Sequence, residues 1–162
     1  MRATEAALWA SSFSCSKDYW EYVKMLVDRL DDVNALIMEG VEGLEPKPQS
    51  VKGKTTFSDP TAAAALRHET ALKKLEKLEA ERNSLFDSIG GALILLDGLR
   101  GVLGSKYADV LALRYLDGFK WSKIAFELNV TAVHAHRLEQ VAHDWIDAHG
   151  WNALVTGRGF AE

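Results

Sequence analysis

The sequence has little of what marks secreted, metal-clustered or membrane-spanning proteins. Its 162 residues include one cysteine, Cys15, so an intrachain disulfide and a zinc site built from several cysteines are both excluded. The longest apolar run, residues 92–96, is far shorter than the roughly 20 residues needed to cross a bilayer. Residues 1–14 lack the apolar segment and cleavage signal of a secretory leader. We therefore expect a cytoplasmic protein with no membrane partner.

Proline is also scarce, and neither sign of charge dominates strongly. Three prolines, many alanines and leucines, and few β-branched runs predict an all-α fold. The formal net charge is −4, which argues against a protein that coats nucleic acid or anionic membrane indiscriminately. A basic surface on one face of the molecule is compatible with this balance, so the positions of the charges matter more than their sum.

An amphipathic helix is predicted over residues 17–38. Apolar residues recur there in steps of four and three, which places them on one face of a helix. This stripe consists of Tyr19, Val23, Leu26, Leu30, Val33 and Ile37. Gly40 and Gly43 offer a stop for the helix, and residues 40–58 show no helical period, which predicts a flexible linker. The first dozen residues have no clear period either, and we expect them to be loosely ordered.

A longer helix is predicted to follow the linker. Asp59 is suited to capping its first amides, and Pro60 at the first helical position loses no hydrogen bond. Between residues 64 and 103, apolar residues alternate in steps of four and three, with polar interruptions at His68 and Arg82. This is the pattern of a coiled-coil seam.

Glycines between Gly90 and Gly104 predict a kink or break in this helix, and we expect a domain boundary near Gly104. Residues 1–104 then form a helical hairpin or coiled coil. Its seam can pair within one chain or between chains, and both kinds of pairing can coexist. We favour an oligomerisation region and a homo-oligomer, with a dimer as the preferred state.

Residues 105–150 predict three short helices, with residues 151–162 as a tail. The second helix, about 120–128, ends at Asn129, and the third runs from the cap Thr131 to about residue 148. Two helices joined by a turn of about three residues predict a helix-turn-helix. The positions expected to be buried between the helices are Ile124, Ala125, Leu128, Val130, Ala135, Leu138 and Ala142, continued by Trp145 or Ile146.

The opposite face of the third helix is then directed outward, and in this motif its N-terminal part enters the major groove of duplex DNA. Arg137 is suited to a guanine edge and Gln140 to an adenine edge, while apolar side chains can contact thymine methyl groups. The predicted base-facing residues are Ala132, Val133, His136, Arg137 and Gln140. Lys120, Lys123 and Thr131 are predicted to lie near phosphates, which position a protein without specifying sequence.

Residues 107–146 resemble the region-four helix-turn-helix of bacterial sigma factors and, more closely, phage and prophage transcriptional regulators of the RinA/ArpU type. The matching residues are Leu113, Arg114, Tyr115, Gly118, Trp121, Ile124, Ala125, Leu128, Thr131, Arg137, Leu138 and Ala142. The resemblance implies sequence-specific control of phage genes, with RNA polymerase as a further possible partner. This chain departs from the pattern at Lys120, at Ser122-Lys123 and at Ala132-Val133.

The sequence disfavours a metal site and a catalytic site. His134, His136, His143 and His149 lie on one predicted helix, but their spacing does not direct a set of them to one metal ion. No nucleophile elbow or phosphate-binding glycine loop is present, and Cys15 has no nearby histidine in the sequence. The sequence therefore predicts neither a cofactor, nor a metal site, nor an enzyme.

Other functions fit the same helices. A phage DNA-packaging protein similar to a small terminase subunit would also join a helix-turn-helix to an oligomerising coiled coil. A helical protein-interaction module acting on RNA polymerase would use the same surface against protein. The plainest alternative is a structural three-helix domain whose outer face is solvated.

Overall fold

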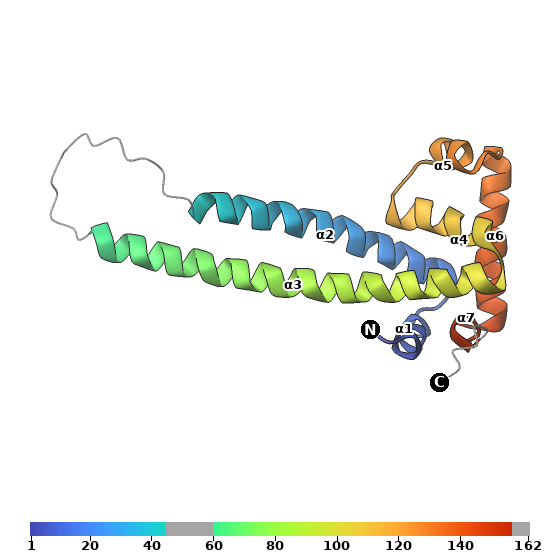
Figure 1. Ribbon diagram of the computed structural model, residues 1–162, viewed down its shortest axis with the longest axis horizontal. Coiled ribbons are helices and arrows are strands. Elements are labelled where there is room, and N and C mark those ends of the chain that lie inside the picture. The colour runs from blue at the N-terminus through green and yellow to red at the C-terminus, as the bar shows by residue number, and fades with distance from the viewer. Residues whose placement is uncertain (45–59, 157–162) are drawn as a thin grey trace. The chain divides into compact units, whose positions relative to one another are not determined.

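The computed structural model describes residues 1–44 and 60–156, and these are helical without a β-strand, which confirms the all-α class (Figure 1). The elements in chain order are α1 (Ala3–Ala10), α2 (Ser16–Leu44), α3 (Pro60–Val102), α4 (Ser105–Leu111), the π-helical turn η1 (Ala112–Leu116), α5 (Trp121–Leu128), α6 (Ala132–His149) and α7 (Asn152–Thr156). Within the described residues, no helix combines the length and the apolar character needed to span a membrane.

The chain divides into two compact units by its internal contacts. The large unit contains residues 1–28 and everything described from Leu85 onward, and the small unit lies between Arg29 and Ser84. Helices α2 and α3 each contribute to both units. The contacts therefore do not divide at Gly104, where we expected a domain boundary, because the first turns of α2 pack together with the C-terminal helices.

The apolar stripe predicted for α2 is confirmed. Tyr19 and Val23 are fully buried in the large unit, and Val33 and Ile37 are buried in the small unit. Helix α2 does not stop at Gly40 or Gly43, however, but continues to Leu44. Gly40 lies so close to Leu75 of α3 that a Cβ there would overlap the leucine side chain, so close packing offsets the low helix propensity of glycine. The rest of the predicted linker lies outside the described residues, as does Asp59.

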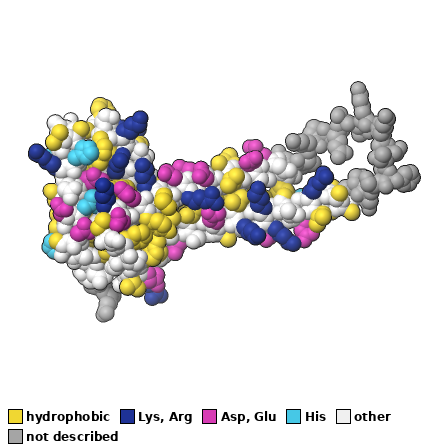
Figure 2. Space-filling view, turned by 180° about the vertical axis from the view of Figure 1, so that it is seen from behind, with side chains coloured by type: hydrophobic (Ala, Val, Ile, Leu, Met, Phe, Trp, Pro, Cys, Tyr) yellow, Lys and Arg dark blue, Asp and Glu magenta, His cyan; other side chains and the backbone are white. Residues whose placement is uncertain are grey.

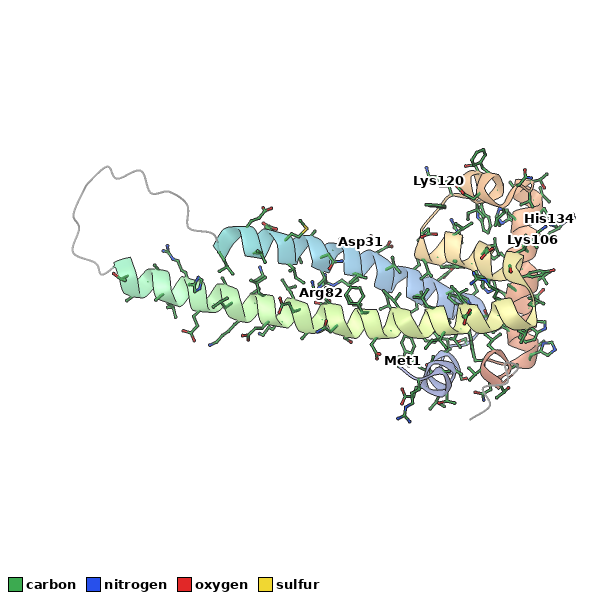
Figure 3. All side chains as sticks on the ribbon, in the orientation of Figure 1. Met1, Asp31, Arg82, Lys106, Lys120 and His134 are labelled. Carbon is green, nitrogen blue, oxygen red and sulfur yellow. The ribbon has the colours of Figure 1, made fainter. Side chains whose placement is uncertain are left out.

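The predicted seam is buried at five of its ten apolar positions, all in α3, whereas Ala64 near the start of the helix is exposed. Of its two polar interruptions, His68 is exposed, whereas Arg82 is partly buried and its Nε has no hydrogen-bond partner among the described residues. Figure 3 shows Arg82 on α3 in the small unit. The buried seam positions are Leu75, Leu85, Ala92, Leu96 and Leu99.

Helix α3 runs on through Gly90, Gly91, Gly98 and Gly101 and ends at Val102, so the break predicted between Gly90 and Gly104 falls at the end of that interval, where Gly104 has φ 127°. Two of its glycines serve packing instead of bending. A Cβ at Gly98 would overlap the carbonyl oxygen of Leu154 in α7, and one at Gly91 would lie 2.5 Å from the sulfur of Met1. The missing side chains let α7 and the N-terminus approach the α3 backbone.

Both ends of the large unit are more ordered than we predicted. The first dozen residues contain α1, whose Ala6, Ala7 and Ala10 are fully buried. The predicted tail begins with Trp151 and α7, which are anchored in the core by buried apolar side chains. Small alanines and a five-residue helix carry too weak a periodic signal to be recognised, and burial against the other elements orders them. Residues 157–162 lie outside the described residues.

The close approach of α3 and α7 gives a stability test. We expect Gly98→Ala to destabilise the protein by about 1–3 kcal/mol, because the added methyl group overlaps the Leu154 backbone and overpacks a filled core. The matched control is Gly90→Ala on the same helix, where nothing lies within 4 Å of an added Cβ. It should stabilise the protein by up to about 1 kcal/mol through helix propensity. Urea unfolding of both variants checks this, and equal effects would contradict the packing role of Gly98.

Candidate nucleic-acid interface

Helices α5 and α6 are joined by a tight turn, Asn129 to Thr131. Asn129 ends α5 in the left-handed conformation, with φ 52° and ψ 48°, as the sequence predicted. The amide of Val130 donates to the Ala125 carbonyl at 3.0 Å, which closes the end of α5. Thr131 then caps α6, since its Oγ1 accepts a hydrogen bond from the His134 amide at 3.2 Å. The local residue types thus determine both helix ends.

The residues expected between these two helices lie in the core. Ile124 and Ala125 of α5 are buried, and Leu128 and Val130 pack against the core while partly exposed. On α6 the buried stripe continues through Ile146, whereas Trp145 is partly exposed. The other buried positions of this stripe are Ala135, Leu138 and Ala142. Their burial leaves the opposite face of α6 in solvent.

All five predicted base-facing residues are exposed on α6. Val133 has 62% of its surface exposed, so an apolar group is presented to solvent near the start of the helix. Gln140 donates from Nε2 to Asp144 at 2.8 Å, while Arg137 has no ion pair with the described residues. Ala132 occupies the first position of α6. His136, with Val133, Arg137 and Gln140, also lines one cleft.

Trp121 supports this face, and sequence reasoning did not assign it to the site. Its indole ring lies against the His136 imidazole, with ring centroids 3.8 Å apart and planes inclined by 31°. The Arg114 guanidinium lies 5.1 Å from the centroid of the same indole, a cation–π distance. These contacts restrain the His136 ring and join α5 to the exposed face of α6. In the sequence, Trp121 stands out only as one of the residues that carry the family resemblance.

The three predicted phosphate-contacting residues surround α5 and the turn. Lys120 and Lys123 are exposed, and the Lys123 Nζ lies 3.7 Å from the centroid of the Phe119 ring. Figure 3 shows Lys120 at the start of α5. Thr131 is exposed as well, but its oxygen is already engaged as the cap of α6. The two lysines are therefore the freer candidates for phosphate contact.

The charges of α6 are unevenly distributed along the helix. Arg137 and the largely buried Glu139 lie in its first half, whereas the exposed Asp144 and Asp147 lie in its second half. Figure 2 shows Lys, Arg and His side chains interspersed with Asp and Glu side chains over the large unit. The N-terminal half of α6 is thus the half that is better suited to an anionic partner.

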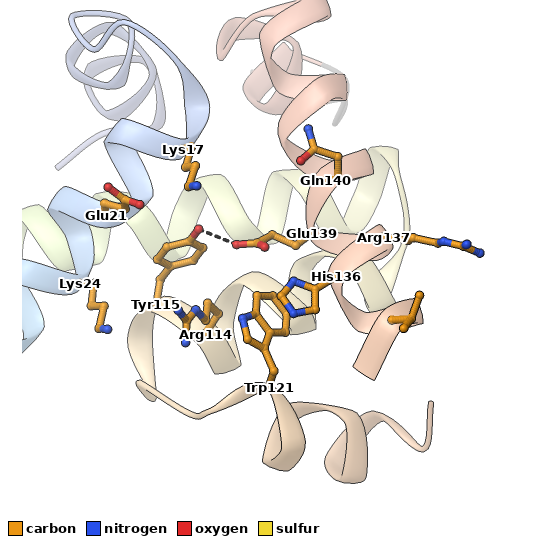
Figure 4. A pocket seen from close by; sticks show the side chains of 11 residues that line it. Lys17, Glu21, Lys24, Arg114, Tyr115, Trp121, His136, Arg137, Glu139 and Gln140 are labelled. Carbon is orange, nitrogen blue, oxygen red and sulfur yellow. Dashed lines mark hydrogen bonds between the residues drawn. The ribbon is translucent and has the colours of Figure 1, made fainter. Parts of the chain in front are cut away.

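A cleft of about 730 Å³ lies beside the exposed face of α6 (Figure 4). Its opposite wall is the first part of α2, with Lys17, Glu21 and Lys24, and its floor includes Arg114 and Tyr115. Lys17 and Glu21 are exposed and Lys24 is partly buried. The sequence gives no signal that this side of α2 faces α6, because more than 100 residues separate the two segments.

A buried polar network behind the cleft connects α2 to α6. The Tyr115 hydroxyl donates to Glu139 Oε1 at 2.6 Å and lies 3.3 Å from His143 Nε2, while the Ser16 hydroxyl lies 2.9 Å from His143 Nδ1. All these contacts are satisfied when Nε2 carries the imidazole proton and Nδ1 accepts from Ser16. Asp147 completes the link, since its Oδ1 accepts from the Ser16 amide at 2.7 Å.

Burial and hydrogen bonding shift the pKa values of two groups in this network. Burial, and next the hydrogen bond to Glu139, raise the pKa of the Tyr115 hydroxyl. For Glu139 the largest influence is burial, which acts to raise the pKa of the carboxyl group. The nearby His143 imidazole, whose Nε2 lies 3.6 Å from Oε1, and the hydrogen bond from Tyr115 outweigh it, so that the pKa is lowered from 4.5. Glu139 is therefore an ionised acceptor within a largely buried cluster.

Ser16, His143 and Glu139 lie near one another in the way that the nucleophile, base and acid of a catalytic triad do. The serine, however, is inaccessible. Ser16 is fully buried and His143 is 5% exposed, so a substrate cannot reach the hydroxyl. The histidines do not combine into a metal site either. His149 bonds to the Trp145 carbonyl, and no three His, Cys, Asp or Glu residues of the described part of the chain are placed to hold a metal ion.

No family model matches the chain, and neither a curated protein nor a solved structure matches it.

The lowered pKa of Glu139 predicts a pH-dependent contribution to stability. The ionised carboxylate stabilises the folded state above the ordinary value of 4.5, and this contribution is lost as the pH falls through the lower folded-state value. We expect Glu139→Gln to cost about 1 kcal/mol near neutral pH, with a smaller difference from the wild type in acid. Urea unfolding across this pH range measures it, with Glu127→Gln on the exposed side of α5 as control. A cost independent of pH would contradict the role of the charge.

Proposed function

We propose that this protein is a sequence-specific duplex-DNA-binding transcriptional regulator that places α6 in the major groove. The observation that carries the proposal is the exposed N-terminal half of α6, which follows a left-handed turn at Asn129 and is supported by Trp121. An α-helix fits the major groove, and a helix held rigidly by a second one presents its side chains in a fixed register.

The exposed side chains of α6 have the chemistry that base recognition needs. Arg137 can donate two hydrogen bonds to a guanine edge, and Gln140 can pair with adenine once its amide leaves Asp144. Val133 offers an apolar contact for a thymine methyl group, and Ala132 offers another. His136 is the remaining residue of the proposed base-facing set. Lys120 and Lys123 flank the helix as phosphate contacts, with Thr131 at the turn.

The direction of insertion follows from charge. The acidic residues Asp144 and Asp147 would repel a phosphate backbone near the end of α6, whereas Arg137 attracts it near the beginning. The N-terminal half of the helix therefore enters the groove. The resemblance to phage and prophage regulators supports transcription of phage genes as the setting, and it supports RNA polymerase as a second partner.

A homo-oligomer is part of the proposal. Residues 119–137 hold Lys120, Lys123 and Arg137 against Glu127, so one subunit offers few phosphate contacts and modest affinity. Two subunits would present two copies of α6 to a symmetric operator. The small unit supports self-association because apolar side chains remain in solvent on both of its helices; the most exposed are Met38 and Leu66, each 65% exposed.

Two substitutions separate base recognition from phosphate binding. We expect Arg137→Ala to cost about 1–3 kcal/mol at a single base position and to relax sequence preference there. Lys123→Ala should instead weaken binding to all sequences about equally, because phosphates carry no sequence information. Selection from a random duplex library, followed by anisotropy measurements on the selected and scrambled sequences, distinguishes the two.

The wild-type result decides whether the proposal stands. Failure of the wild-type protein to retain any duplex from the library would contradict DNA binding and favour a protein-interaction module. If both variants bound like the wild type, the exposed face of α6 would not be the interface.

The mass of the protein in solution distinguishes a regulator from a packaging component. We expect a dimer with twice the 17.9 kDa mass of the chain, as two half-sites of an operator require. Light scattering coupled to size-exclusion chromatography measures this mass. A large ring would instead favour the small-terminase alternative, and a monomer would contradict the oligomeric part of the proposal.

A further inference from the structure

The cleft between α2 and α6 has a basic wall that the helix-turn-helix does not supply. Lys17 and Lys24 of α2 line it opposite α6, and Arg114 of η1 lies between them and Trp121 (Figure 4). Neither lysine has an ion pair with the described residues. The cleft also contains Glu21 on α2, so its charge is mixed but predominantly positive.

Glu139 reduces this positive charge less than its position suggests. Its side chain is 15% exposed, and it accepts the Tyr115 hydroxyl at 2.6 Å with His143 at 3.6 Å. Its charge is therefore directed into the buried network. Arg114 remains at the cleft, close to the Trp121 ring.

The geometry of a helix in the major groove determines what meets this wall. The groove is about 12 Å wide, similar to the diameter of a helix with its side chains, so a sugar–phosphate backbone runs along each side of an inserted helix. Figure 4 shows Arg137 directed away from α2, whereas Lys17 and Lys24 lie across the cleft from α6. One side of α6 thus faces open solvent, and the other faces a hollow with a basic wall.

We infer that this cleft receives one sugar–phosphate backbone of the duplex whose groove holds α6, and that Lys17 and Lys24 neutralise its phosphates. The inference rests on the proposed function and adds a second phosphate-binding surface, which comes from α2. Positive charge, a hollow of about 730 Å³ and its position beside α6 all match a phosphodiester strand. The Glu21 carboxylate repels the phosphates of this backbone.

The salt dependence of binding tests the inference directly. Each lost phosphate contact lowers the slope of log affinity against log salt by about 0.9 in magnitude. Lys17→Ala combined with Lys24→Ala should therefore reduce the slope by about two and weaken binding to a mixed-sequence duplex roughly tenfold or more at low salt. The control is Lys74→Ala with Lys77→Ala, two exposed lysines of the small unit, which removes the same charge. It should leave the slope nearly unchanged.

A variant that should bind more tightly tests the inference without relying on a loss of binding, which a folding defect could also cause. Glu21 is exposed, so Glu21→Gln should fold normally, and removing the like charge should tighten binding severalfold. Two results would overturn the inference while the wild type still binds duplex. One is an unchanged salt slope in the double α2 variant. The other is that Lys17 and Lys24 are needed for binding adenosine 5′-monophosphate but not for binding duplex DNA. This result would show that the cleft holds a small anion and not a DNA backbone. No duplex binding by the wild type would instead reject the proposed function itself.

Discussion

The attachment of α2 to α6 at Ser16 is the constraint on which the candidate interface depends. The Ser16 amide is one of the unpaired donors at the start of α2, and burial without a partner would cost about 1–3 kcal/mol. Asp147 accepts this amide, and His143 bonds to the hydroxyl of the same residue. Glu139, His143 and Asp147 are spaced by four, so one side of α6 is committed to this contact. The other side, with Arg137 and Gln140, is necessarily left in solvent.

A buried aromatic cluster supplies the apolar stabilisation that the polar contacts of Ser16 do not provide. Trp20 of α2 is fully buried, with Tyr115 and Trp151 both 6.3 Å from its ring centroid. An aromatic side chain buries about 150–250 Å², which at about 25 cal/mol per Å² is worth roughly 4–6 kcal/mol. The indole Nε1 has no partner among the described residues, at a cost of about 1–3 kcal/mol. The apolar term is the larger, so the cluster stabilises the fold despite its unpaired donor.

The sequence predicts those parts of the site that depend on near neighbours. Asn129, Thr131 and the apolar stripe of α6 act within one or two helical turns, and the structure places each as expected. The cleft depends on the pairing of Ser16 with His143, which are 127 residues apart. No periodicity encodes such a contact. The packing role of Gly98 is hidden from the sequence for the same reason, because its small size is needed by α7, an element that local pattern does not reveal.

The acidic balance of the chain is a weak guide to what the α6 face can bind. Exposed charges separated by more than about 8–10 Å are largely screened at physiological salt, so a phosphate responds to its immediate surroundings and not to a net charge of −4. Counting along the sequence finds three basic residues near the turn, since it can include only neighbours in the chain. Folding adds Lys17, Lys24 and Arg114 to the same surface, while the buried network retains Glu139. Glu21 remains on the same wall, so the fold separates the charges only in part, but basic side chains outnumber acidic ones around the cleft of this acidic protein.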